Sequence, residues 1–453
     1  MSRGTVGLVS EYDVLGDQWM TRRVTAVLSV GLVALTALAA AEDRSVGQSP
    51  RDQIAAVVLA AWRGPELAGA KAGLDFEAAA SRVQVHLGSP YAEVEREGIG
   101  WDFEPEPTAV WSLRFGIPFN WPGQGSAVGN FIEATDRRVT VESRLAALDL
   151  AERAVAAWLD LAATGERIGV LESQLGHLVG ALGLQRKRLE LGEVSGHEVS
   201  QLELERARLV TELATLRSTN ASAAAALHRL SGADAPRPNG PVLDRLLDQM
   251  PPFSWDDGAA AVAMEDSPWL VASAAEVERR RLEGKQAGRT AFGRPEFEVT
   301  WARVPDVGDL DGFDAAGLRL KVPLPLGQAG KRRRAESEAG VRHALARQQQ
   351  TRWMLEARMA EAATRLTEAS ISLATLSEVE DELADVQYSL DQQYRLGVIS
   401  YLGYLDGVRR LDDVRVQAII ARHAELRARL ELAVLTGDKS LFPLPDFDEE
   451  SLR

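Results

Sequence analysis

The sequence predicts a mostly α-helical protein with a small β part, assembled from two copies of one unit. Three observations support this fold class. The chain repeats itself at a fixed offset, long segments place apolar residues at steps of three and four, and short segments alternate apolar with polar residues. Each half is therefore expected to contain a lead helix, a strand pair, a very long helix, a tight turn and a return helix.

The duplication rests on residues that control backbone geometry. The offset is 205 residues, the separation of Pro90 from Pro295, and it continues without insertion from position 90 to position 232. Glycine and proline fix turns and helix ends, so composition alone would not align them. The first repeat is assigned to 50–232 and the second to 263–437. Further matched pairs are Pro118 and Pro323, Gly125 and Gly330, Gly192 and Gly397, and Gly232 and Gly437.

Residues 1–41 have the layout of a secretory signal peptide. A basic head at Arg22 and Arg23 precedes a short apolar stretch, and three alanines before Glu42 form a small-residue cleavage site. The polar segment ahead of this signal makes Met20 a candidate for the true start. A retained membrane anchor is the alternative, although the apolar stretch is short for a spanning helix.

Each half should contain one clear strand. Apolar and polar residues alternate over 111–119 and again over 318–324, while the partner strands are weaker, with alternation at 297–301. Strands of about ten residues with aromatic residues near their ends suit a transmembrane barrel. A soluble sandwich or hairpin is the alternative. Four strands are too few to close a barrel, so the membrane interpretation requires several chains to contribute strands.

The long helices carry a heptad pattern, which favours coiled-coil packing. The apolar seam covers 150–185 in the first half and 355–390 in the second. At about 1.5 Å per residue, a helix over 126–190 would extend roughly 95 Å. The return helix 196–231 and the lead helix 268–291 together approach this length, so we expect them to stack end to end beside one long helix.

Two segments lie outside this helical pattern. Residues 233–262 are expected to be a proline-rich linker at mid-shaft, because proline prevents a helix from continuing. Residues 438–453 are expected to form an acidic tail. The prolines of the linker are Pro236, Pro238, Pro241, Pro251 and Pro252.

Composition excludes several classes of function. The chain has 51 Lys and Arg against 66 Asp and Glu, a formal charge of −15, which does not suit a nucleic-acid binder. It contains no cysteine, and its six histidines are scattered without a second histidine at metal-ligand spacing. The sequence shows no phosphate loop, nucleophile motif or paired-carboxylate site. We therefore expect neither an enzyme nor a bound metal or cofactor.

The long helix of each half ends in the same short turn. Gly192 and Gly397 can adopt the left-handed conformation that ends a helix, and Ser195 and Ser400 can cap the next one. The sequence thus predicts two helical hairpin tips at the far end of a long shaft. The residues common to both tips are Leu191, Gly192 and Ser195, then Leu396, Gly397 and Ser400.

With these features the chain resembles the outer-membrane efflux protein family, whose best-known member is TolC. The resemblance covers about residues 50–437 and rests on the tandem repeat, the Leu-Gly-x-Val/Ile-Ser tips and the Val-Pro-Leu-Pro-Leu segment at 322–326. It implies a homotrimer in which each protomer contributes four strands to a twelve-stranded β-barrel in outer-membrane lipid, and helices to a periplasmic tunnel of twelve helices. It also implies that the six tip residues dock onto a periplasmic membrane-fusion adaptor, which joins an inner-membrane pump. The alternative is that these residues only form the turn.

The resemblance further places a narrow tunnel entrance just after the second tip. Asp406 matches an acidic position there, whereas Gly403 stands where a second aspartate would be expected. Three copies of Asp406 round a threefold axis would form an acidic constriction, and the alternative is a solvated carboxylate. Tyr401 and Tyr404 would line this constriction or pack the tip. The run 331–334 is expected to contact lipid headgroups or solvent.

The function implied is passive. The chain would be an exit channel in the cell outer membrane that conducts substrate delivered by the adaptor and pump of a tripartite efflux or type I secretion system. The alternative is a periplasmic coiled-coil adaptor or another interaction protein without a channel. That class would have one hairpin flanked by β-rich modules, whereas this sequence predicts two hairpins in duplicated halves.

Overall fold

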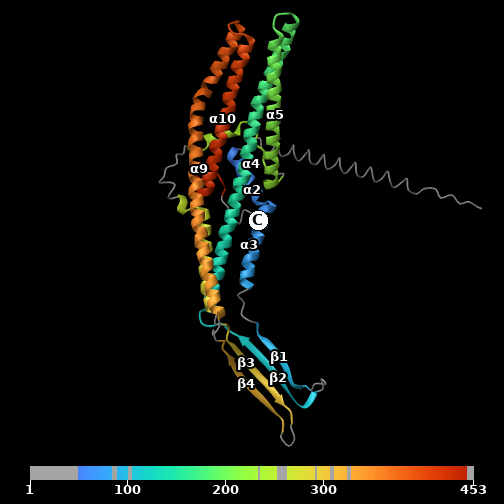
Figure 1. Cartoon of the computed structure of the whole chain (residues 1–453), viewed down its shortest axis with the longest axis vertical. Coiled ribbons are helices and arrows are strands. Elements are labelled where there is room, and N and C mark those ends of the chain that lie inside the picture. Colours follow the sequence, from blue (N-terminus) through green and yellow to red (C-terminus); the bar gives the residue numbers. More distant parts are fainter. Residues whose placement is uncertain are drawn as a thin grey trace, which may run out of the picture.

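The molecule is elongated, with a long helical shaft and a small sheet at one end (Figure 1). The predicted signal peptide lies outside the described residues, as do 446–453 of the predicted tail and parts of the predicted linker. The computed structural model describes residues 49–83, 89–99, 105–232, 235–251, 263–290, 293–306, 311–323 and 328–445.

Two helices run the whole length of the shaft and confirm the long helices expected from the heptads. They are α4 (Gln124–Glu190) and α9 (Gln328–Arg395), with 67 and 68 residues. At about 1.5 Å per residue each is roughly 100 Å long. Each turns back at the far end into a return helix of 36 residues, α5 (Gly196–Ser231) or α10 (Tyr401–Thr436), as predicted. None of the described helices is long and apolar enough to cross a membrane.

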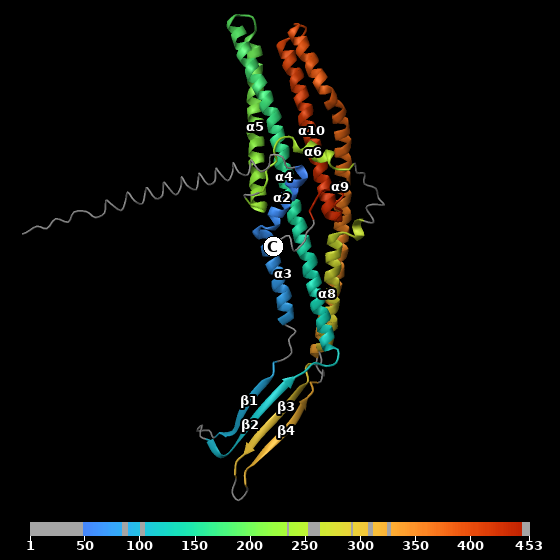
Figure 2. The same ribbon diagram turned by 180° about the vertical axis from the view of Figure 1, so that it is seen from behind.

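Shorter helices complete the shaft toward the sheet. α2 (Pro50–Trp62) and α3 (Pro65–Val83) precede the first strand pair, and α8 (Pro268–Thr290) precedes the second. Figure 2 shows α3 below α5 and α8 below α10, so the described helices form four columns, of which α4 and α9 are unbroken. α3 and α5 pack on one side of α4, and α8 and α10 lie between α4 and α9.

The stacking of the short helices differs from the prediction. The sequence suggested that α5 and α8 stack end to end, but α5 ends beside the start of α3, and α10 ends beside the start of α8. A Cβ atom built on Gly64, just before α3, would lie 3.2 Å from the Leu230 carbonyl oxygen of α5. The Ser267 hydroxyl, just before α8, donates to the Leu435 carbonyl oxygen of α10 at 2.7 Å. The summed helix lengths could not distinguish stacking of α5 on α8 from stacking of α5 on α3, because α3 and α8 are of similar length.

The two predicted strand pairs form one antiparallel sheet in the order β1-β2-β3-β4. They are joined through the two central strands, where Leu113 pairs with Trp301. The outer two strands each have one unpaired edge within the described chain. The strands are β1 (Tyr91–Ile99), β2 (Pro105–Pro118), β3 (Glu296–Val304) and β4 (Phe313–Lys321).

This sheet is inside out compared with that of a soluble protein. Its apolar face is open, and Leu318 of the outer strand β4 on that face is 75% exposed. On the opposite, charged face Glu298 is only 4% exposed, because Arg114 and Arg319 lie against it, with Arg319 Nη1 3.1 Å from Glu298 Oε1. Soluble sheets bury the apolar face and leave the charged face in water. The other exposed apolar side chains of this face are Val94, Trp111, Leu113, Phe115, Ile117, Phe297, Val299, Trp301 and Leu320.

The main hydrophobic core lies at mid-shaft, where α2, α4, α6 and α10 meet. Trp158 of α4 and Leu426 of α10 are fully buried there. The predicted seam is confirmed in both long helices, since none of its residues within 150–185 or 355–390 is exposed. Leucine is the commonest residue of these seams, and the small alanines among them let the helices approach closely.

Two segments expected to be irregular contribute to this core. Within the predicted linker, a short helix, α6 (Val242–Asp248), buries Leu243 and Leu246. In the predicted acidic tail, Leu441 and Phe442 are buried in the same core. The described part of the tail is therefore packed on the shaft rather than extended from it, because its few large apolar side chains gain more from burial than its charges lose.

Candidate functional site

The two tips of the shaft have the same backbone geometry. Each long helix ends just before a leucine, and the following residue, Gly192 or Gly397, has a positive φ of 76° or 70°. Ser195 Oγ accepts a hydrogen bond from the amide three residues later at 3.4 Å, and Ser400 Oγ accepts the equivalent bond at 3.1 Å. Glycine and serine thus act as the turn and cap residues that the sequence predicts.

The tip leucines have no part in the packing of the protomer. Leu191 is 73% exposed and Leu396 is 76% exposed, and Val398 beside the second tip is also exposed. The need to form a turn explains the glycine and the serine, but it does not explain an exposed leucine at the same place in both repeats. The leucines are therefore the strongest docking candidates. Val398 was not singled out from the sequence, although the Val/Ile position of the tip motif lies next to it.

Replacing both cap serines by alanine should loosen the tips without unfolding the shaft. Loss of an N-cap costs about 1 kcal/mol, which corresponds to roughly fivefold faster local opening. The rate of local opening in Ser195→Ala and Ser400→Ala would be measured by hydrogen exchange of the Glu198 and Gly403 amides, which donate to the cap hydroxyls. Ser200→Ala is the matched control, because the Ser200 hydroxyl bonds only to a carbonyl of its own helix. Unchanged exchange at both capped amides would show that the caps contribute nothing.

Asp406 lies on an exposed part of α10, where its Oδ2 is 2.8 Å from Arg410 Nη2. At about 100° of rotation per residue, Asp406 is roughly 200° round the helix from Tyr404. The structure therefore places Asp406 and the tyrosines on different faces of α10. Arg410 was not singled out from the sequence, although its spacing of four residues from Asp406 is the usual one for an ion pair on a helix. This pairing reduces the negative field that Asp406 projects.

Tyr401 and Tyr404 pack the tip. Both rings meet Tyr394 of α9, with centroids 5.2 Å apart in each pair. Burial, together with a hydrogen bond to the Asp391 carboxylate, raises the pKa of Tyr404 to about 12. Of the two roles left open by the sequence, the contacts of these tyrosines fit packing. Tyr394 completes the cluster, and its position in the last turn of α9 was the only signal for it.

The two hairpins are held together just below the tips. Leu402 and Leu405 of α10 pack against the buried leucine cluster between α4 and α5. Arg409 of α10 also has its Nη1 3.5 Å from Glu205 Oε1 of α5. These contacts join the second repeat to the first at the end of the shaft that carries Asp406.

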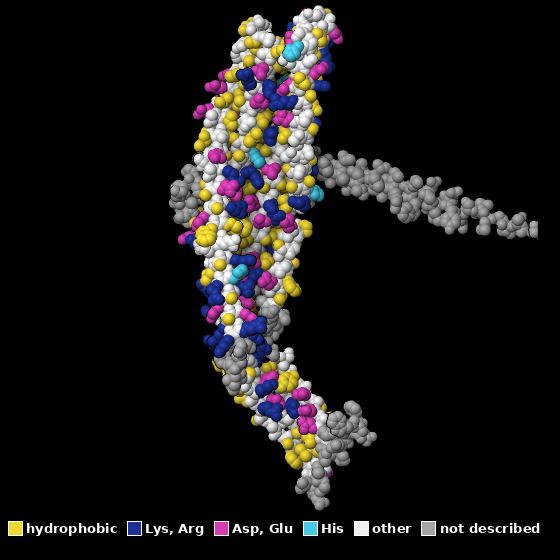
Figure 3. All heavy atoms as spheres, in the orientation of Figure 1, with side chains coloured by type: hydrophobic (Ala, Val, Ile, Leu, Met, Phe, Trp, Pro, Cys, Tyr) yellow, Lys and Arg dark blue, Asp and Glu magenta, His cyan; other side chains and the backbone are white. Residues whose placement is uncertain are grey.

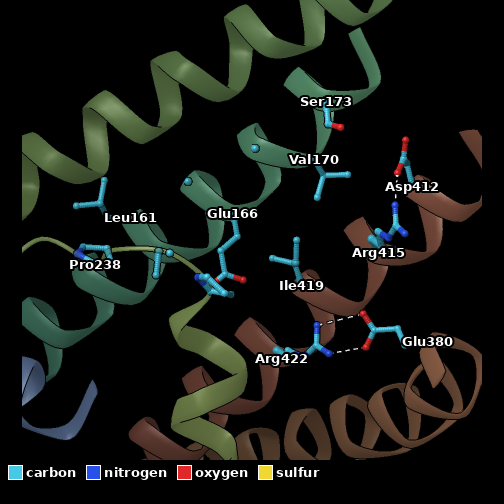
Figure 4. A pocket seen from close by; sticks show the side chains of 15 residues that line it. Leu161, Glu166, Val170, Ser173, Pro238, Glu380, Asp412, Arg415, Ile419 and Arg422 are labelled. Carbon is cyan, nitrogen blue, oxygen red and sulfur yellow. Dashed lines mark hydrogen bonds and ion pairs between the residues drawn. The ribbon is translucent and has the colours of Figure 1, made fainter. Parts of the chain in front are cut away.

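A cavity of about 690 Å³ opens at mid-shaft between α4, α10 and the segment before α6 (Figure 4). Leu161 and Ile419 form part of its apolar wall, and Asp412 and Arg415 lie along one side. Asp412 is buried, and burial raises the pKa of its carboxyl group. One of its oxygens accepts a hydrogen bond from Arg415 at 2.8 Å, and the other has no hydrogen-bond partner among the described residues.

The charged groups of this cavity anchor the predicted linker to the shaft. Glu166 Oε1 accepts hydrogen bonds from the first two amides of α6 at 2.8 and 3.2 Å. Arg422 pairs with Glu380 of α9, and its Nε is 3.0 Å from Asp244 Oδ1 of α6. The charged groups of the cavity therefore serve to connect α6 to α4, α9 and α10. Across the described ranges, no three His, Cys, Asp or Glu residues are grouped so that they could hold a metal ion.

Comparison with known proteins gives matches at the level of structure. No family model matches the sequence, and no curated protein matches it. The MtrE outer-membrane channel of Neisseria gonorrhoeae, solved in its open state, matches with a TM-score of 0.63 and 17% identity over 86% of this chain and 89% of that one. The CmeC outer-membrane channel of Campylobacter jejuni matches with a TM-score of 0.62 and 13% identity over 86% and 85%. The outer-membrane protein VceC of Vibrio cholerae matches with a TM-score of 0.62 and 16% identity over 85% and 96%.

These matches cover most of each chain, although identity is low. They confirm the predicted fold class, in which duplicated long helical hairpins accompany a small sheet. They also confirm, for the fold, the resemblance read from the tandem repeat and the tips. The chain therefore has the fold of the TolC-like outer-membrane efflux channels.

Proposed function

We propose that the chain is an outer-membrane exit channel of a tripartite efflux or type I secretion system. It would passively conduct substrate from a periplasmic adaptor and an inner-membrane pump to the exterior. The observation that carries the proposal is the inside-out sheet, with an exposed apolar face opposite a charged one. No catalytic role is proposed, because the similar structures are channels.

The exposed face has the dimensions of a lipid-facing band. Apolar side chains alternate from Trp111 of β2 to Phe119 just beyond its end, which at about 3.3 Å per residue corresponds to roughly 26 Å along the chain. The apolar band of an outer-membrane barrel is about 25 Å tall. The charged face, with Glu298 between Arg114 and Arg319, would then line the water-filled interior.

The open edges of the sheet support a shared barrel. Within the described chain β1 and β4 each have one unpaired edge, and unpaired edges are templates for pairing with another chain. Three copies would pair β4 with the next β1 and close twelve strands. In the same assembly, α9 of one protomer would meet the column of α3 and α5 of the next, which completes a periplasmic tunnel of twelve columns.

The tips are proposed to dock onto the periplasmic adaptor. Leu191 and Leu396 would supply apolar contacts, while Gly192, Ser195, Gly397 and Ser400 shape the turns. The alternative, an adaptor or interaction protein without a channel, would leave the apolar sheet face unexplained. That class would also have a single hairpin, whereas this chain has two.

The proposal is tested by the mass and conductance of the purified protein. The full chain is extracted from the outer-membrane fraction with detergent, and its mass is measured by light scattering before and after heating. A trimer that forms conducting pores in planar lipid bilayers is expected. A monomer or dimer recovered in water without detergent, or a trimer that does not conduct, would contradict the channel.

The same bilayers test the proposed acidic ring. If three Asp406 side chains lie in the tunnel, Asp406→Asn should lower the preference for cations, and Arg410→Gln should raise it by removing the charge that pairs with Asp406. The reversal potential across a KCl gradient measures this preference. Asp248→Asn in α6 is the control, because it removes an equal charge at mid-shaft. Reversal potentials that do not differ from the control would exclude Asp406 from the conduction path.

A further inference from the structure

The end of the shaft next to the sheet carries positive charge without matching negative charge. Most arginines nearby are paired; Arg279 and Arg280, for example, both lie 2.8 Å from Glu276. In contrast, six cations at this end have no carboxylate at ion-pair distance in the described part of the chain. Figure 3 shows Lys and Arg side chains gathered where the shaft meets the sheet. The six unpaired cations are Lys285, Arg289, Arg294, Lys331, Arg333 and Arg334.

This local excess of positive charge runs against the composition, because the whole chain has a formal charge of −15. A surface with the opposite sign to its protein indicates a partner with negative charge. The exposed Arg332 in the same run pairs with Glu336 at 2.7 Å, so paired and unpaired cations lie side by side.

Three of the six cations line one cleft. Lys285 and Arg289 of α8 and Arg334 of α9 lie round a cavity of about 410 Å³ that α4 closes from the third side. Gly284 and Gly288 form part of its wall, so two wall positions beside the cations carry no side chain, and the Ser337 hydroxyl packs against Gly284. The cleft has room for a phosphate group with its glycerol attached.

The cleft lies beside the end of the sheet that joins the shaft. Gln124 Nε2 at the start of α4 donates to the Arg289 carbonyl oxygen at 2.8 Å, and the Phe119 amide donates to the Pro295 carbonyl oxygen at 2.9 Å. These bonds fix the end of α8 beside the ends of β2 and β3. The first apolar row of the sheet, including Ile117, is exposed there.

We infer that this cleft binds the phosphate of anionic phospholipid headgroups in the membrane leaflet on the shaft side. The inference rests on the proposed function, because that function places the apolar band in lipid and so puts the cleft at headgroup level. Guanidinium and ammonium groups next to an apolar band are well placed to contact lipid phosphates from the protein side. The bound headgroup would fix the depth of the barrel in the membrane.

The test uses the full chain purified as the detergent-extracted complex. It is titrated in an uncharged detergent with dansyl-labelled phosphatidylglycerol or dansyl-labelled phosphatidylcholine, and the fluorescence change gives the affinity. The triple variant Lys285→Gln, Arg289→Gln and Arg334→Gln should bind phosphatidylglycerol at least about tenfold more weakly. The triple variant should also no longer bind phosphatidylglycerol more tightly than phosphatidylcholine. The matched control, Lys187→Gln, Arg206→Gln and Arg237→Gln, removes the same charges from exposed positions away from the sheet.

The outcomes separate the inference from the function on which it rests. The lipid site would be overturned if the triple variant kept its affinity for phosphatidylglycerol, or if the control variant lost as much affinity. The proposed channel would still be supported in that case if the protein formed conducting pores. Competition by inorganic phosphate at the same concentration as the lipid would also overturn it, because the cleft would then bind free phosphate. A water-soluble monomer without conductance would overturn both.

Discussion

Arginine placed at both Val299 and Leu318 should prevent the chain from accumulating as a folded trimer in the outer membrane. These residues pair across β3 and β4, midway along the two strands on the apolar face. An arginine near the centre of a lipid-facing band costs about 2–4 kcal/mol, and two together approach the whole stability of a typical domain. The measurement is the amount of heat-resistant trimer in the outer-membrane fraction, which should fall to a small part of the wild-type amount.

The opposite face provides the matched control. Ser112 and Ala302 also pair with each other, across β2 and β3, but on the charged face of the sheet. Arginine at both positions adds the same charge to the proposed water-filled side. This control should assemble to within about twofold of wild type, since substitutions facing the interior change selectivity more than stability. Equal assembly of the two double variants would mean that the apolar face does not meet lipid.

Arg138→Met should destabilise the half of the shaft nearest the sheet by about 3 kcal/mol or more. The Arg138 side chain is 9% exposed, and it joins α3 to α8 through Glu77 at 2.5 Å and Glu276 at 3.3 Å, with Glu142 of its own helix at 3.0 Å. Methionine keeps the unbranched aliphatic part of the side chain but leaves these carboxylates without their shared cation. The measurement is the thermal midpoint of the helical circular dichroism signal.

The neighbouring Arg137 serves as control, since its side chain is 74% exposed and, among the described residues, forms an ion pair only with Glu133. Arg137→Met should cost less than about 1 kcal/mol. If the thermal midpoint fell no further in Arg138→Met than in Arg137→Met, the buried cation would not be what holds α3, α4 and α8 together.

The charges around Arg138 also predict how the shaft responds to acid. Burial raises the pKa of Glu276, but hydrogen bonds and charge from Arg279 and Arg280 outweigh it and lower the pKa to about 2. This carboxylate therefore stabilises the fold above its unfolded pKa near 4.5, and the contribution is lost as the pH falls toward 2. Burial raises the pKa of Glu142 despite Arg138. Without Arg138 that pKa rises further, so the defect of Arg138→Met should shrink as the pH falls and Glu142 becomes protonated.

The features that the sequence predicted correctly depend on residues close together in the chain, and most of them occur in both repeats. The seam 150–185 and its copy 355–390 show which faces of the long helices are buried, because a helix repeats its faces every 3.6 residues. Gly192 and Gly397 identified the tips because few residues other than glycine adopt a positive φ at a helix end. The alternation along β2 identified the two faces of the sheet.

The features that the sequence did not predict depend on contacts between distant residues. Ser267 and Leu435 are 168 positions apart, and nothing near either residue indicates that they meet. The partner of Glu298 and the burial of Phe442 likewise depend on segments brought together only by the fold. At the candidate site, the exposure of Leu191 and Leu396 could not be read from a turn motif, because the same motif would serve a buried turn.

The junctions in the two broken columns mean that, in each repeat, the helix before the strand pair begins at the height of the shaft where the return helix ends. α3 starts where α5 ends, and α8 starts where α10 ends. A unit whose two ends are neighbours can be copied head to tail in a gene, since the connection between copies only has to cross from one column to the next. The mid-shaft junctions therefore mark the place where the termini of a single-repeat ancestor would have lain.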